Sequence, residues 1–116
     1  MTEQETFDIV VTNLRKQGCK SLSMSGECRY RTPEGLRCAA GWLIQDEDYM
    51  DDIEDTPVLS TSRKSNKITT LIQSYGHNVD LVRELQKVHD IYSVDSWEEH
   101  FALIATHYNL KYEEPT

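Results

Sequence analysis

The sequence is poor in the residues that mark several specialised classes of protein. It has five glycines, three prolines and three cysteines among 116 residues. Its longest mostly apolar run, Cys38 to Ile44, is far shorter than the ~20 residues that span a bilayer. These scarcities exclude a collagen-like, disulfide-rich or membrane-spanning chain. The first residues lack the basic start of a signal peptide, so we expect a cytoplasmic protein.

The remaining composition is typical of one globular domain. Hydrophobic residues make up 38% of the chain and charged residues 28%, which is too apolar for a disordered chain. A chain of this length can build one hydrophobic core, whereas two cores would each be too small to fold unaided. We therefore expect residues 1–116 to form a single domain.

Apolar residues recur at helical spacing in four segments. These segments are Phe7–Leu14, Ile68–Tyr75, Leu81–Tyr92 and Trp97–Tyr108. Two of them follow a capping box, formed by Thr2 with Glu5 and by Ser96 with Glu99. The sequence therefore predicts four helices.

Residues 19–40 predict a small β element. Cys28 and Tyr30 alternate with charged neighbours, as on a half-buried strand flanked by turns. The following run, Leu36 to Ile44, suits either a partner strand or a short buried helix, and its alanines favour a helix beginning near Arg37. The expected fold class is α+β, mostly helical, with about four helices around one core and a small β-hairpin near residues 19–40.

Negative charge is concentrated in one segment of the chain. The net charge is −8, and Asp46 to Asp55 holds seven acids and no base. A calcium loop is excluded, because Asp51 stands at the sixth position and Pro57 at the twelfth, where the EF-hand needs glycine and glutamate. A solvated loop and mimicry of a nucleic acid backbone both remain open interpretations.

Apolar residues within the acidic segment favour a contact surface, because an apolar anchor inside a charged rim is typical of interfaces. The expected partner is another protein in preference to a nucleic acid, and no membrane is expected. The candidate partner-binding residues are Asp46, Asp48, Tyr49, Met50, Asp51, Asp52, Ile53, Glu54 and Asp55, with Arg29 and Arg31 contributing. The competing interpretation is an internal latch, in which the arginines at 29, 31 and 37 pair with these acids.

Cys28 and Cys38 with a histidine such as His89 are the candidate ligands for a zinc ion. Structural zinc sites usually present ligands in pairs two to four residues apart, and the sequence has no such pair. We therefore expect buried thiols, no metal and no cofactor, and His89 as a hydrogen-bonded residue at the edge of the core. Without a phosphate-binding glycine loop or a nucleophile elbow, the sequence predicts no enzyme.

A third interpretation is binding of a nucleic acid or a nucleotide phosphate. Arg29, Arg31 and Arg37, together with the segment Arg63 to Lys67, supply guanidinium and ammonium groups that suit phosphate. Duplex binding usually requires a broad basic face, whereas this chain is acidic overall. This interpretation therefore ranks below protein binding.

One set of motifs resembles a known family. The motifs are Cys28-Arg29-Tyr30-Arg31, Gly35 to Gly41, Leu43-Ile44, Leu85 to Asp90, and Trp97. Together they are similar to a small family of uncharacterised proteins encoded by bacteriophages and prophages, in which a Cys-x-Tyr…Gly-x-x-Cys-Ala-x-Gly-x-Leu-Ile segment recurs. Trp42 stands where the family pattern has a further cysteine. The resemblance implies a phage accessory protein that binds and modulates or inhibits a host or defence protein in the bacterial cytoplasm.

Overall fold

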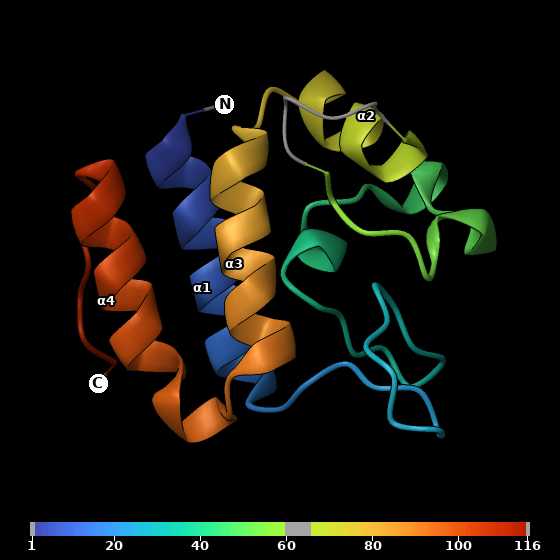
Figure 1. The fold of residues 1–116 in the computed structure, drawn as a ribbon, viewed down its shortest axis with the longest axis horizontal. Helices are drawn as coiled ribbons and strands as arrows, with labels where there is room; N and C mark the ends of the chain where they lie inside the picture. The colour runs from blue at the N-terminus through green and yellow to red at the C-terminus, as the bar shows by residue number, and fades with distance from the viewer. Residues whose placement is uncertain (1, 60–65, 116) are drawn as a thin grey trace.

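The computed structural model describes residues 2–59 and 66–115 (Figure 1). These residues form four α-helices: α1 (Glu3–Gln17), α2 (Lys67–Ser74), α3 (Val79–Ile91) and α4 (Trp97–Tyr108). They also form four short 3₁₀ turns: η1 (Ala40–Trp42), η2 (Asp46–Asp48), η3 (Asp51–Ile53) and η4 (Val94–Ser96). The prediction of four helices is confirmed.

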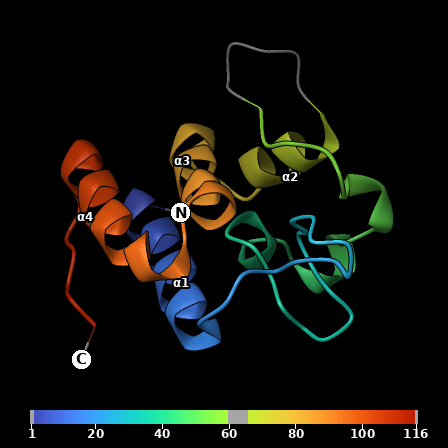
Figure 2. The ribbon, with the colours of Figure 1, turned by 60° about the horizontal axis from the view of Figure 1, so that its bottom comes forward.

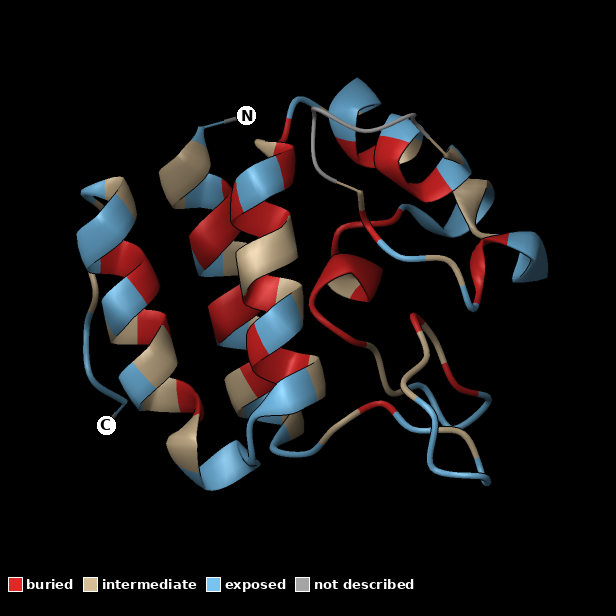
Figure 3. Cartoon of the chain, in the orientation of Figure 1, coloured by how far each residue is buried: buried red, intermediate tan, exposed pale blue. Residues whose placement is uncertain are grey.

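Helix α3 holds the two sides of the molecule together. It packs against α1 and α4 on one side, and against α2 and η1 on the other (Figures 1 and 2). Its apolar stripe is buried between these elements, with Leu81, Val82 and Leu85 fully enclosed (Figure 3). The acidic segment and the loops before it therefore lie across α3 from α4.

The ends of the helices test the predicted caps. Thr2 and Glu5 form the expected capping box at the start of α1, and Gly18 ends this helix in the left-handed conformation at φ 68°. The predicted box of Ser96 with Glu99 is wrong, because Ser96 makes no capping hydrogen bond to α4. Its hydroxyl instead donates to the carbonyl oxygen of Ser93 at 3.0 Å, within the η4 turn that leads into the helix.

The predicted β-hairpin near residues 19–40, and with it the α+β class, is wrong: the described residues form a helical protein without a β-strand. Within residues 2–59 and 66–115, β pairing is limited to two isolated antiparallel bridges, between Leu22 and Cys28 and between Arg31 and Arg37. A ladder does not grow from them because side chains occupy the neighbouring backbone donors. The N–H of Tyr30 donates to the Glu54 carboxylate, and the N–H of Ser21 donates to the His89 ring.

The run from Leu36 to Ile44 forms the single 3₁₀ turn η1 and not a longer helix. Gly41, within this turn, packs directly against backbone. A Cβ atom at Gly41 would lie 2.0 Å from the carbonyl oxygen of Tyr30, far inside van der Waals contact. The buried turn therefore requires glycine at this position for steric reasons.

Candidate functional site

The acidic segment folds as the two 3₁₀ turns η2 and η3, and its residues divide into an inner and an outer set. Ile53 is fully buried in the core, and Glu54 is 8% exposed. Because they are buried, these two residues cannot contact a partner in this conformation. They are therefore excluded from the contact surface that the sequence predicted. The outer residues, with exposed or partly exposed side chains, are Asp46, Glu47, Asp48, Tyr49, Met50, Asp51, Asp52 and Asp55.

Glu54 is the internal anchor of this segment. Its carboxylate accepts hydrogen bonds from the backbone N–H groups of Tyr30 at 2.9 Å and Arg31 at 3.1 Å. It also accepts one from the Tyr49 hydroxyl at 2.6 Å and lies 3.7 Å from the Arg29 guanidinium. A buried carboxylate with this many donors is fully compensated. The pKa of Tyr49 is raised to about 12, by burial first and then by the bond to Glu54.

Arg31 and Arg37 hold the segment at its first acid. Both guanidiniums reach the same oxygen of Asp46, at 3.0 Å and 3.4 Å. Each guanidinium also lies over an aromatic ring, Tyr49 for Arg31 and Trp42 for Arg37. The internal latch considered from the sequence is therefore formed in part, because Arg31 and Arg37 both pair with Asp46.

The acids that form ion pairs in this segment remain exposed to solvent. The Asp46 side chain remains 80% exposed, and that of Asp52 remains 59% exposed although Lys67 lies 2.9 Å away. Met50 is 57% exposed between them. Tyr49, Met50, Asp51 and Asp52 line a shallow surface hollow. The apolar side chain of Met50 thus lies on an acidic surface whose conformation is fixed by the buried contacts of Glu54.

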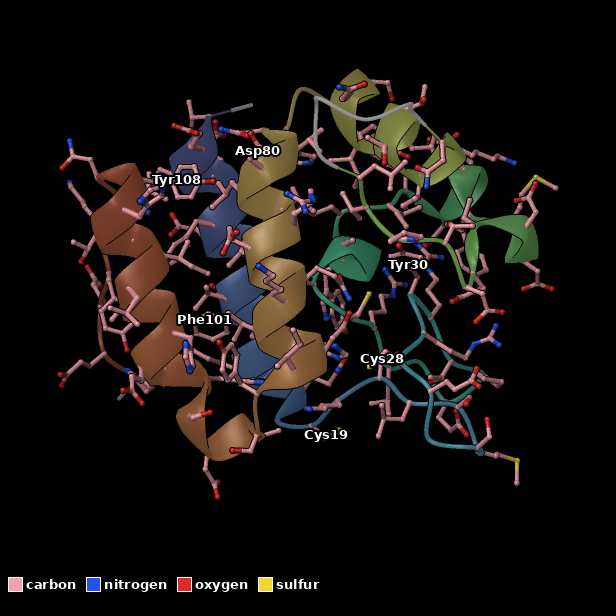
Figure 4. The ribbon with its side chains drawn as sticks, viewed as in Figure 1. Cys19, Cys28, Tyr30, Asp80, Phe101 and Tyr108 are labelled. Carbon is pink, nitrogen blue, oxygen red and sulfur yellow. The ribbon has the colours of Figure 1, made fainter. Side chains whose placement is uncertain are left out.

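A second group of candidate residues meets at the C-terminal half of α3. Cys28, His89 and Asp90 each place a potential ligand atom within 4.8 Å of the other two. Cys38 is buried and accepts a hydrogen bond from the N–H of Gly41 at 3.4 Å. Cys28, Cys38 and Asp90 line one pocket of about 380 Å³, while the triplet of Cys28, His89 and Asp90 contains only one of these two cysteines. Figure 4 shows Cys28 on the loop side of α3.

The hydrogen bonds of this triplet define its protonation. The N–H of Ser21 donates to Nε2 of His89 at 2.9 Å, so the proton of the neutral ring is on Nδ1, which lies 2.7 Å from Asp90. Burial acts to raise the pKa of Asp90, but hydrogen bonds from His89, Gln86 and Cys28 outweigh it and lower this pKa. Burial and the Asp90 charge raise the pKa of Cys28 to about 11, which makes its thiol a hydrogen-bond donor and a poor nucleophile.

Sequence reasoning missed two members of this group, Asp90 and Gln86. Gln86 donates to Asp90 at 2.8 Å and accepts from the N–H of Ala40 at 2.8 Å, so it ties η1 to α3. His89 and Asp90 follow Gln86 by three and four residues at the end of the apolar stripe. This spacing places polar side chains on one helix face, so it could have indicated the group from the sequence.

Two further observations concern the whole chain. No protein-family model, curated protein or solved structure matches it. Across the described ranges, no helix combines the length and apolar character needed to cross a membrane. Of the segment Arg63 to Lys67, considered above for phosphate binding, residues 63–65 lie outside the described residues.

Proposed function

We propose that this chain is a non-enzymatic binding protein that docks an acidic face onto a basic surface of another protein. The acidic face consists of the exposed residues Asp46, Glu47, Met50, Asp51, Asp52 and Asp55. The observation that carries the proposal is Met50, which is 57% exposed among these carboxylates. An apolar side chain in a charged rim provides contact area, while the rim gives orientation and specificity.

The internal contacts behind the face support binding with little reorganisation. Glu54 and Ile53 fix the segment from inside, and the bridge from Asp46 to two arginines fixes its first turn. A surface that is already ordered loses less conformational entropy on association than a flexible loop. The excess of exposed carboxylates would attract a basic partner over a Debye length of about 10 Å.

The resemblance to bacteriophage proteins suggests the setting. In that setting the partner is a host or defence protein in the bacterial cytoplasm, and docking would modulate or inhibit it. A basic groove that normally holds nucleic acid is the kind of surface that closely spaced carboxylates match.

The test is a charge reversal that leaves Ile53, Glu54 and the Asp46 bridge unchanged. Purified wild-type chain and a Glu47→Lys/Met50→Ala/Asp51→Lys variant are used to capture partners from bacterial lysate, and the captured proteins are identified by mass spectrometry. We expect the variant to lose a basic partner that the wild type retains, and the retained complex to weaken as salt rises.

The matched control reverses two exposed acids elsewhere, in a Glu99→Lys/Glu114→Lys variant. These residues lie on α4 and the C-terminal segment, across the molecule from η3 (Figure 1). The control changes the net charge by the same amount as the test variant and should capture the partner normally. Equal capture by all three proteins would refute docking through the acidic face.

A further inference from the structure

We infer that Cys28, His89 and Asp90 form a binding site for a divalent cation of the zinc class, with one coordination position open to the adjacent pocket. The three ligand atoms lie within 4.8 Å of one another, although Cys28 is far from the other two in the sequence. The triplet shares no residue with the acidic face, although Asp55 lines the same pocket, so metal binding is tested independently of partner docking.

The donor set indicates the class of metal. The triplet offers one sulfur, one nitrogen and one oxygen, a mixture that suits zinc better than magnesium or calcium, which prefer oxygen alone. Zinc sites with three protein ligands keep a fourth position for water or another ligand. Tetrahedral bonds of about 2.0–2.3 Å require ligand atoms about 3.5 Å apart. Nδ1 and the Asp90 oxygen, now 2.7 Å apart, must therefore separate slightly around the ion.

The proton balance is simple. Zinc replaces the thiol proton of Cys28, which goes to solvent, and it takes the position of the Nδ1 proton of His89. The neutral imidazole then carries its proton on Nε2, so the ring neither gains nor loses a proton overall. The site changes from one negative charge, on Asp90, to a neutral group of Zn²⁺, thiolate, carboxylate and imidazole. No oxidant or reductant is involved.

The shift of the ring proton has one structural cost and one ready compensation. The N–H of Ser21 now donates to Nε2 at 2.9 Å, and this hydrogen bond must break when Nε2 gains a proton. The hydroxyl of the same residue is buried and has no hydrogen-bond partner. We infer that this hydroxyl turns to accept from a protonated Nε2, as in metal sites where a second partner orients the ligating histidine. The Ser21 N–H then lacks the acceptor it now has, and this cost is set against three metal–ligand bonds.

The adjacent pocket would leave the fourth coordination position of the metal accessible to a ligand. Cys28 and Asp90 line a pocket of about 380 Å³ together with Cys38, Gln86 and Arg83. A water molecule or a small anionic ligand can therefore reach the fourth coordination position, with the arginine nearby to balance its charge. The site would thus bind a metal ion and present it to a small ligand.

The test is metal binding by the full chain. Chelator-treated protein is titrated with Zn²⁺ against a competing indicator, and with Co²⁺ while visible and near-ultraviolet absorption is followed. We expect one ion per chain and a thiolate-to-cobalt charge-transfer band. Cys28→Ser should abolish this band and weaken zinc binding about 100-fold, whereas Cys19→Ser, which changes an exposed cysteine outside the triplet, should bind like the wild type.

A second variant tests the role of the serine hydroxyl. Ser21→Ala keeps the backbone N–H but removes the proposed acceptor, and should weaken zinc binding about 10-fold. Folding of each variant is checked by circular dichroism. A wild-type chain that shows no charge-transfer band with Co²⁺ would overturn the inference whatever the variants do. Equal zinc affinity of the wild type and a folded Cys28→Ser variant would do the same.

Discussion

Glu54 and Tyr30 form a hydrogen bond that determines the conformation of the loop half of the molecule. The buried Glu54 carboxylate accepts the backbone N–H of Tyr30 at 2.9 Å, and the Tyr30 hydroxyl donates in turn to the carbonyl oxygen of Thr56, two residues after Glu54. Tyr30 thus bonds through its backbone to Glu54 and through its side chain to Thr56. These two bonds join the end of the acidic segment to the loop that carries Cys28.

Replacing Glu54 should therefore destabilise the protein. Glu54→Gln keeps the shape but replaces one acceptor oxygen with an NH₂ donor facing backbone N–H groups, and it removes the charge that pairs with Arg29. We expect the free energy of unfolding to fall by about 1–3 kcal/mol, measured by urea denaturation. Glu47→Gln, at an exposed position of the same segment, is the control and should leave the midpoint unchanged.

A methyl group at position 41 should be more disruptive than one at another glycine. Gly41→Ala places Cβ against the Tyr30 carbonyl oxygen and should cost at least about 3 kcal/mol of stability. Gly35→Ala meets open space, so only its left-handed backbone at φ 93° opposes it, at a cost of about 1 kcal/mol. Thermal unfolding of both variants compares them, and equal losses would contradict the steric explanation.

Protonation of His77 should make stability dependent on pH. The His77 ring is buried, shares a 2.6 Å hydrogen bond with the Thr6 hydroxyl of α1, and has a pKa that burial lowers. The unfolded chain therefore takes up this proton first, and the native state loses stability as pH falls below about 6.5. Above that pH both states hold the neutral ring, and His77 has no effect on the pH dependence.

The measurement is the free energy of unfolding of wild type and His77→Gln between pH 7 and pH 5. The wild type should lose stability across this window, and the variant should lose less, because it has no imidazole to protonate at this site. His107→Gln, which removes an exposed imidazole from α4, is the matched control. An identical acid loss in the wild type and His77→Gln would show that burial of this ring does not couple to protonation.

The helices were predictable from local information. The spacing of apolar residues and the capping box of Thr2 with Glu5 depend on neighbours within one or two turns, and the structure forms both the helices and this cap. The failure at residues 19–40 has the opposite cause. Cys28 and Tyr30 do alternate as on a strand, but the donors that would extend a ladder go to Glu54 and His89, which are distant in the sequence.

The candidate sites show the same division. The charge of the acidic segment was visible in the sequence, whereas the inward direction of Ile53 and Glu54 was not, because a 3₁₀ turn has no long-range periodicity. The suspected association of Cys28 with His89 is present in the fold, but Cys38 lies outside the triplet and Asp90 takes its place. Which of two plausible side chains completes a cluster depends on loop geometry that a single sequence does not encode locally.

The attachment of the loops to α3 also determines how the molecule can open. Residues 19–59 contain no α-helix; they are held by buried apolar side chains such as Ile44 and Ile53, and by side-chain bonds from Glu54, Gln86 and His89 to backbone groups. If those bonds and apolar contacts break together, this half separates as one cooperative unit while α1, α3 and α4 stay packed. In amide hydrogen exchange, the N–H groups of Ser21, Tyr30 and Ala40 would share a common opening free energy below that of global unfolding. A protease would then cut first near Met24, whose side chain is fully exposed at the tip of a turn.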